Sequence, residues 1–189
     1  MIQRIGPYRY LLDAQDQITF VSREWLAFAQ ENGAPHLTEE MVLGKPVWGF
    51  IADQATRVLY QQLFERVRKQ PSEFILPFRC DSPEQRRFMS LTVRTAPRAG
   101  VELEGRLLRA ESYQAPVLDS PTTRRTGLTV WMCSSCKHIR VTASEWVEVE
   151  QALVRVRAFT LSEPPRLRYA ICPRCYEEVT SLLREKSAT

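Results

Sequence analysis

The amino-acid sequence predicts an α+β protein, with a five-stranded antiparallel sheet that carries short helices on one face and a small four-cysteine, zinc-ribbon-like module at the C-terminus. Two observations support this fold class. Two strands, several short helices and three further strands follow one another, an order that favours one sheet covered by helices. Cys133 with Cys136, and Cys172 with Cys175, then form two Cys-x-x-Cys pairs, which supply the four thiolates of a structural zinc site.

The first strands are expected at residues 8–12 and 18–21, because short apolar runs flank a polar turn. Ser22 is a suitable N-cap for a helix that ends at Gly33. A short helix is expected over residues 37–43, entered through Thr38 and broken by Gly44-Lys-Pro46.

A longer helix is expected over residues 53–69. Its predicted apolar stripe consists of Val58, Leu59, Leu63, Phe64 and Val67. Turn-forming Pro and Gly residues then separate three strands, expected at residues 73–80, 87–95 and 101–110.

The N-terminal part resembles a PAS domain over about residues 5–111. The resemblance is carried by Asp13 and Asp16 in the first hairpin, by Ser22-Arg-Glu-Trp25, by Gly44-Lys-Pro46-Val-Trp48, and by Phe78-Arg-Cys-Asp-Ser-Pro83 followed by Arg86-Arg87-Phe-Met. The last segment is similar to a hairpin of a bacterial PAS-like subfamily. The resemblance implies a domain that senses a small ligand, a cofactor or a partner, and many such domains dimerise.

The chain is therefore divided into a PAS-like sensory domain at 1–112, a proline-containing linker at 113–127 and a metal-binding module at 128–189. In the module, strands are expected at 128–132 and 167–171, and a final helix at 176–185. Between the strands, Ser144 is expected to cap a helix whose inward stripe is Trp146, Val149, Leu153 and Val156.

The module also resembles cysteine-rich tails that follow sensory domains in bacterial signal-transduction proteins. It shares their Cys-x-x-Cys-Lys-x-Ile-Arg, Trp-x-x-Val-Glu and Ile-Cys-Pro-x-Cys segments. In those tails a histidine often precedes the last cysteine pair. Tyr169 and Ala170 stand there in this chain, so that histidine is missing and ligation by the four cysteines remains available.

The leading interpretation of the four cysteines is one structural zinc ion, and a thiol redox switch or unligated cysteines are the alternatives. The 35 residues between Cys136 and Cys172 exceed the spacer of a compact ribbon, which predicts an inserted helix. Cys80 is expected to be a half-buried structural cysteine, with a reactive thiol as the alternative. His36 is expected on the surface, and His138 is an alternative metal ligand.

Two further groups are candidate binding residues. Aromatic side chains are expected between helices and sheet, either as plain core or as the border of a ligand pocket; they are Trp25, Phe28, Trp48, Phe50, Phe64 and Phe78. Charged residues cluster in a predicted hairpin, either as a solvated turn or as a partner-docking surface; they are Arg79, Asp81, Arg86 and Arg87.

Composition disfavours several function classes. The net charge of +4 comes without a dense basic stripe, which disfavours a nucleic-acid-associated regulator that would use Arg124, Arg125, Lys137, Arg140 and Arg174. No apolar run reaches the roughly 18–20 residues of a membrane span, and no secretion signal is recognised, so a cytoplasmic protein is expected. Two histidines and no catalytic constellation argue against an acid–base enzyme, and no catalytic residue is assigned.

The sequence thus predicts a non-catalytic, homodimeric signalling protein. Its PAS-like domain would sense an unidentified ligand or dock a partner, and its zinc-stabilised tail would bind a signalling protein such as a kinase or regulator. A nucleic-acid-associated regulator and a thiol-based redox sensor are the alternatives.

Overall fold

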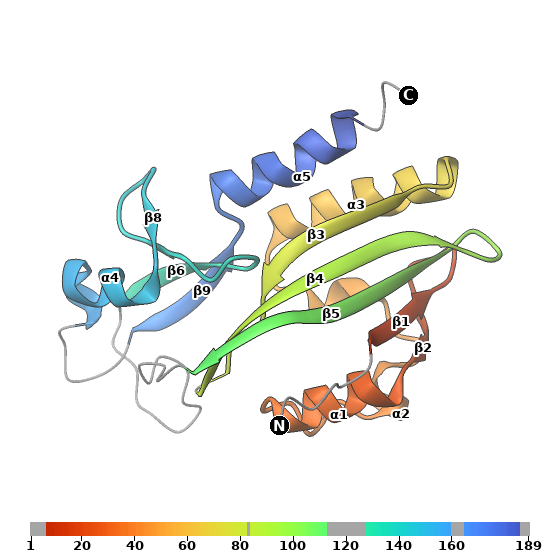
Figure 1. The fold of residues 1–189 in the computed structure, drawn as a ribbon, viewed down its shortest axis with the longest axis horizontal. Helices are drawn as coiled ribbons and strands as arrows, with labels where there is room; N and C mark the ends of the chain where they lie inside the picture. The colour runs from red at the N-terminus through yellow and green to blue at the C-terminus, as the bar shows by residue number, and fades with distance from the viewer. Residues whose placement is uncertain (1–6, 83, 113–127, 160–164, 186–189) are drawn as a thin grey trace.

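The computed structural model describes residues 7–82, 84–112, 128–159 and 165–185. The linker predicted at 113–127, with Arg124 and Arg125, lies outside these residues. The described chain forms a five-stranded sheet in the order β2-β1-β5-β4-β3 and a four-stranded sheet in the order β8-β7-β6-β9 (Figure 1). None of the described helices has the length and apolar character needed to cross a membrane.

The first sheet confirms the predicted α+β order of elements. Its strands, all antiparallel to their neighbours, are β1 (Tyr8–Leu12), β2 (Ile18–Val21), β3 (Glu73–Arg79), β4 (Gln85–Ala96) and β5 (Gly100–Ser112). Between β2 and β3 lie α1 (Arg23–Glu31), α2 (Glu39–Val42), the short 3-10 helix η1 (Val47–Phe50) and α3 (Gln54–Lys69).

The N-terminal core lies between this sheet and its helices. Helix α3 is capped by Asp53, whose side chain accepts a hydrogen bond from the Thr56 amide, and it buries Leu59, Leu63, Phe64 and Val67. Val58, predicted in the same stripe, is exposed instead, because it lies about 100° around the helix from Leu59. On β4, alternation turns Met89, Leu91 and Val93 towards the helices.

Gly100 is required where β5 passes close to β1. A Cβ atom at this position would lie 2.6 Å from the Leu12 carbonyl oxygen, which is backbone and has no flexible side chain to move away. The preceding Arg98 and Ala99 both have positive φ, so the chain reverses sharply between β4 and β5 and brings Gly100 against the neighbouring strand.

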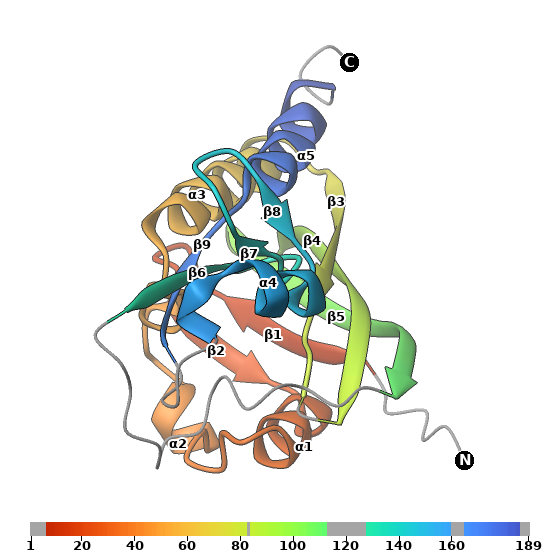
Figure 2. The ribbon, with the colours of Figure 1, turned by 90° about the vertical axis from the view of Figure 1, so that its left-hand side faces the viewer.

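The second sheet brings the two cysteine pairs together. Its strands are β6 (Thr129–Cys133), β7 (Ile139–Arg140), β8 (Trp146–Val147) and β9 (Arg166–Ala170), with α4 (Val149–Arg155) and the 3-10 helix η2 (Arg157–Phe159) before β9 (Figure 2). Strands β6 and β9 are parallel, and Cys133 lies opposite Ala170. Parallel strands end at the same edge of a sheet, so the loops that carry both cysteine pairs emerge side by side.

The helix predicted from Ser144 begins later in the structure. Trp146 and Val147 form β8 and pair with β7, and α4 starts only at Val149. Upstream, the Thr142 hydroxyl oxygen accepts hydrogen bonds from the Ser144 and Glu145 amides and so fixes a turn. Pairing with β7 thus overrides the helical spacing of these apolar residues, because aromatic and β-branched side chains also suit a strand.

The final helix, α5 (Pro173–Glu185), joins the two parts of the molecule. It begins earlier than residue 176, because Pro173 fits the first turn of a helix, where its missing N–H costs nothing. Val179, Leu182 and Leu183 pack into the core of the first sheet, and α5 lies beside α3 (Figure 1). The module that carries the cysteines therefore contributes its last helix to the N-terminal core.

Candidate functional site

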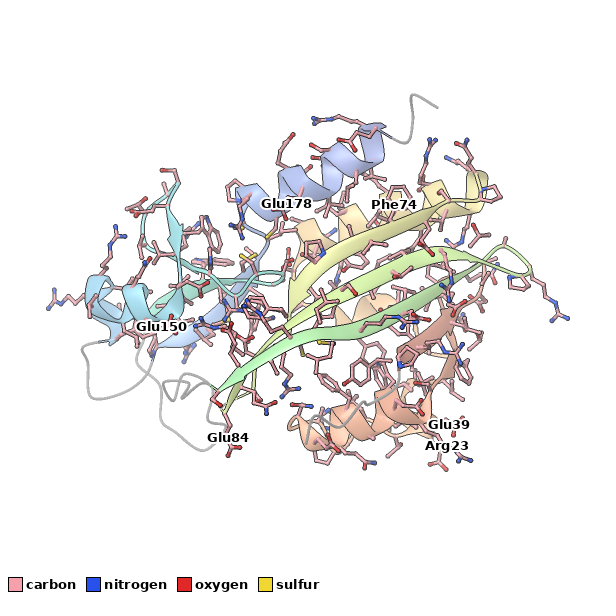
Figure 3. All side chains as sticks on the ribbon, viewed as in Figure 1. Arg23, Glu39, Phe74, Glu84, Glu150 and Glu178 are labelled. Atoms are coloured by element: carbon pink, nitrogen blue, oxygen red, sulfur yellow. The ribbon has the colours of Figure 1, made fainter. Side chains whose placement is uncertain are left out.

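Four buried cysteine sulfurs form a compact cluster at the C-terminal ends of the parallel strands β6 and β9. The Sγ atoms of Cys133, Cys136, Cys172 and Cys175 all lie within 4.8 Å of one another, and those of Cys136 and Cys172 are 3.7 Å apart. Tetrahedral ligation at a metal–sulfur distance of about 2.3 Å would separate the sulfurs by about 3.8 Å. These four residues could therefore hold a metal ion; Figure 3 shows sulfur atoms gathered beside the first turn of α5.

Local backbone geometry aims the thiols at one point. Lys137 adopts a positive φ, which lets the loop after Cys136 turn back so that the Cys133 amide donates to the His138 carbonyl at 2.7 Å. The amides of Cys136 and Cys172 both donate to the Cys133 sulfur, at 3.5 and 3.3 Å. Such bonds stabilise a thiolate.

The crowded thiols favour bound positive charge. Hydrogen bonds from the Cys136 and Cys175 thiols lower the pKa of Cys133, whereas the bond to Cys133 raises the pKa of Cys136 to about 12 and also raises that of Cys175. Several thiolates at this spacing repel one another strongly unless a cation lies between them. The cluster is thus suited to a divalent ion that would displace the remaining protons.

The other candidate ligands lie elsewhere. His138 Nε2 is 3.1 Å from Glu148 Oε1, and His36 is exposed in a loop. Cys80 is partly buried at the end of β3, where burial raises the pKa of its thiol. Sequence alone could not separate His138 from the ligands, because it follows Cys136 by only two residues.

An ion-pair group, made of Arg79, Asp81, Arg86, Glu148 and Glu150, joins the first sheet to the module; Arg79 is buried, whereas Glu150 is exposed. The Arg79 guanidinium contacts the Asp81 carboxylate, and its Nη1 lies 2.7 Å from Glu148 Oε2. Arg86 contacts Glu150, at the start of α4, and lies 3.8 Å from Glu148. Burial disfavours the charge on Arg79, but the hydrogen bonds to its two carboxylates outweigh burial and raise its pKa.

Backbone and hydroxyl contacts continue this junction towards the cysteine cluster. The Arg79 amide donates to the Ser135 carbonyl at 2.8 Å, and the hydroxyls of Thr56 and Ser134 are 2.9 Å apart. Ser134 and Ser135 lie between the first two cysteines, so the loop that carries this cysteine pair contacts both β3 and α3. Arg87, also part of the predicted partner surface, contacts residues within the chain. It is buried, donates a hydrogen bond to the Asn32 side chain and places its guanidinium over the Phe28 ring.

A cavity of about 290 Å³ lies where the sheet, α3 and α5 meet. Trp25, Phe28 and Phe78, from the predicted aromatic set, line it. The other three lie outside this lining. Trp48 donates from Nε1 to Asp16 at 3.2 Å, Phe64 is fully buried in the core, and Phe50 is 44% exposed.

The C-terminal module forms part of the cavity wall. Its contribution comes from the two loops that carry the cysteine pairs and from α5. These residues are Ser134, Ser135, Ile171, Cys175, Glu178, Val179 and Leu182. Figure 3 labels Glu178 on α5. Sequence reasoning missed these residues because their only local signal, an apolar stripe on the last helix, does not show which surface the stripe covers.

Of the basic residues considered for nucleic acid, the described ones make contacts within the chain. Lys137 Nζ donates to the Ser134 carbonyl at 3.0 Å, and Arg140 lies over the Trp131 ring. Arg174 is 3.9 Å from Glu178.

No protein-family model matches this chain, and no curated protein matches it. Solved structures similar to it include the PAS domain of the RpfR quorum-sensing receptor of Cronobacter turicensis in complex with BDSF, with a TM-score of 0.42 and 14% identity over 58% of this chain and 100% of that chain. Another is the Aer2 receptor of Vibrio cholerae, described as a dual PAS-heme oxygen sensor, with a TM-score of 0.39 and 10% identity over the same shares. A sensory box sensor histidine kinase of Vibrio cholerae has a TM-score of 0.40 and 8% identity over 58% of this chain and 87% of that chain.

The order of elements in the first sheet is the one that the sequence predicts. Two strands, the helices and three strands follow in sequence, and β1 and β5 pair at the centre of the order β2-β1-β5-β4-β3. The fold class is therefore α+β, with a five-stranded antiparallel sheet joined to a module with four clustered cysteines.

Proposed function

We propose that this chain is a non-catalytic signalling protein in which a PAS-like sensory domain and a zinc-stabilised C-terminal module work as one unit. The observation that carries the proposal is their shared junction: both contribute walls to one cavity, and Arg79 of the first contacts Glu148 of the second. An event in the cavity can therefore reach the module directly, through packed side chains.

The ion proposed for the four cysteines is zinc in a structural role. All four ligands come from the protein and are buried, so no coordination position is left for water or substrate. The second sheet also has a small core of its own, built around Val130, Ile139 and Val149. Metal binding would then supply part of the free energy that folds the module.

The output proposed for the module is contact with a partner. A signalling protein such as a kinase or regulator, or a second copy of this chain in a homodimer, would detect the position of the docked module. The support is the docking itself, because an element held by contacts from a ligand cavity can change its position or stability when that cavity fills.

The test is metal analysis of the purified full-length chain, with thiols counted before and after chelation and mass measured by light scattering. We expect about one zinc per chain, with four additional reactive thiols after chelation. A metal-free protein with disulfide-linked cysteines would contradict the structural-zinc proposal and favour a thiol-based redox sensor. A mass of one chain across the concentrations tested would contradict the homodimer.

A further inference from the structure

We propose that the cavity binds a neutral, largely apolar small molecule and that the metal centre strengthens this binding, because the loops that carry the cysteine pairs form one of its walls. The inference rests on the function proposed above. It adds the chemical class of the ligand and a thermodynamic link between the ligand and the ion.

Residues in or beside both cysteine pairs form one wall of the cavity. Ser134 and Ser135 lie inside the first pair, Ile171 directly precedes the second, and Cys175 is itself one of the four ligands; all four line the cavity. Loss of the ion would free both loops, since the ion is the bond that would tie the two cysteine pairs to one point. The cavity would then lose the part of its wall that these loops form.

The lining favours a neutral ligand. Most of the lining surface comes from aromatic and aliphatic side chains, and the polar groups include the hydroxyls of Tyr10, Tyr60 and Thr56. Burial raises the pKa of Tyr60 to about 12, so this hydroxyl remains protonated at neutral pH. Among the described lining residues there is no lysine or arginine, and Glu178 is the one carboxylate. A buried anion would therefore lack a counter-charge, which is costly.

The volume limits the ligand to a small molecule. About 290 Å³ is at the lower end of the range for small-molecule sites. A neutral probe of suitable size is N-phenyl-1-naphthylamine, whose fluorescence rises in apolar surroundings. Its 8-sulfonate derivative has the same rings and one negative charge, so the two probes form a matched pair that isolates the effect of charge.

Linkage makes the proposal testable from both sides. If the ion strengthens binding of the probe, the probe must strengthen binding of the ion by the same factor. Probe binding is measured by fluorescence titration of the zinc-loaded full chain and of the same chain after chelation, with circular dichroism to check that the first sheet stays folded. Zinc binding is measured by equilibrium competition with a chromophoric chelator, with and without the probe.

We expect the neutral probe to bind the zinc-loaded chain at least tenfold more tightly than the sulfonate, to bind less tightly after chelation, and to lower the share of zinc that the chelator takes up at equilibrium. Equal binding of the two probes would overturn the assignment of a neutral ligand. Equal binding with and without zinc, together with an unchanged equilibrium transfer of zinc to the chelator, would overturn the link to the metal.

A cavity-filling variant tests the same proposal without touching the metal ligands. Gly105 lines the cavity, and a Cβ atom added there would meet Tyr8 at 3.6 Å, an ordinary contact. Gly105→Val should weaken binding of the neutral probe at least tenfold, keep the zinc content, and make the equilibrium transfer of zinc to the chelator independent of the probe. Gly49→Val is the matched control, because Gly49 has open space around it outside the cavity.

The two proposals fail in different ways. A zinc-loaded chain that binds neither probe would overturn the neutral-ligand inference and leave the zinc-stabilised signalling module standing. A chain without zinc would overturn the proposed function at its metal site, whatever the probe does.

Discussion

Arg79 and Glu148 meet across the two parts of the molecule, with the Arg79 Nη1 atom 2.7 Å from Glu148 Oε2. Arg79 ends β3 of the first sheet, and Glu148 precedes α4 of the module. The Arg79 side chain is only 6% exposed, so its charge depends on the two carboxylates beside it. The contact therefore fixes the module against the sheet in one orientation.

Separate and combined replacement of this pair should reveal their coupling. Arg79→Met should lower the free energy of unfolding by about 1–3 kcal/mol, because it leaves carboxylates without their buried partner. Arg79→Met combined with Glu148→Gln should cost less than the sum of the two single changes, as measured by urea unfolding. Arg155→Met, which removes the exposed partner of Glu145, is the control and should change stability little. Additive single effects would show that the pair is not coupled.

The same pair should make the junction sensitive to acid. Burial opposes ionisation of Glu148, but the hydrogen bond from Arg79 outweighs burial, so the pKa of Glu148 is lowered from its ordinary value of 4.5. A carboxyl group whose pKa is lower in the folded state stabilises that state above its unfolded pKa and loses this effect as pH falls through the folded pKa. The stability difference between the natural chain and Glu148→Gln should therefore be constant near neutral pH and shrink below about pH 4.5. A difference that grows with acid would contradict this assignment.

Replacing a valine of α5 and a valine of α4 by alanine should show how much the packing of α5 contributes to stability. Val179 is 9% exposed and packs into the core of the first sheet, whereas Val154 is 83% exposed on α4. Val179→Ala should lower the free energy of unfolding by about 2 kcal/mol, because it removes two buried carbons and leaves a small cavity. Val154→Ala makes the same chemical change in solvent and should have almost no effect in the same thermal or urea unfolding assay. Equal effects would mean that α5 is not part of the core.

Replacement of single cysteines should separate the metal ligands from Cys80. Cys172→Ser should abolish most of the zinc content and destabilise the second sheet, because a hydroxyl is a poor substitute for a thiolate ligand. Cys80→Ser should keep the zinc, because Cys80 lies outside the four-sulfur cluster. Metal analysis and thermal unfolding of the two variants provide the comparison. Full zinc retention by Cys172→Ser would remove that residue from the site.

The sequence was sufficient for features determined by local patterns. The apolar stripe predicts α3, and turn residues separate β3, β4 and β5 close to where the structure places them. The two Cys-x-x-Cys pairs predict a four-sulfur cluster before any fold is known, because each pair can place two thiols on one point.

Long-range pairing was beyond local patterns. Arg79 looks like part of a solvated turn because its partner Glu148 is 69 residues away in the chain. Trp25 and Trp48 are equally aromatic, yet one lines the cavity and the other bonds Asp16. The apolar stripe of α5 predicts burial without naming the surface that it covers, so the shared cavity could not be foreseen.

The position of α5 in the chain has a consequence for synthesis on the ribosome. This helix is made after every strand that it covers, and Cys172 and Cys175 emerge just before it or within it. A nascent chain that stops before residue 172 holds only two of the four sulfurs and leaves apolar surface of the first sheet uncovered. Chains that stop there would therefore be recognisable to chaperones and proteases, whereas a chain that includes α5 gathers its four cysteines and completes this core in one late step.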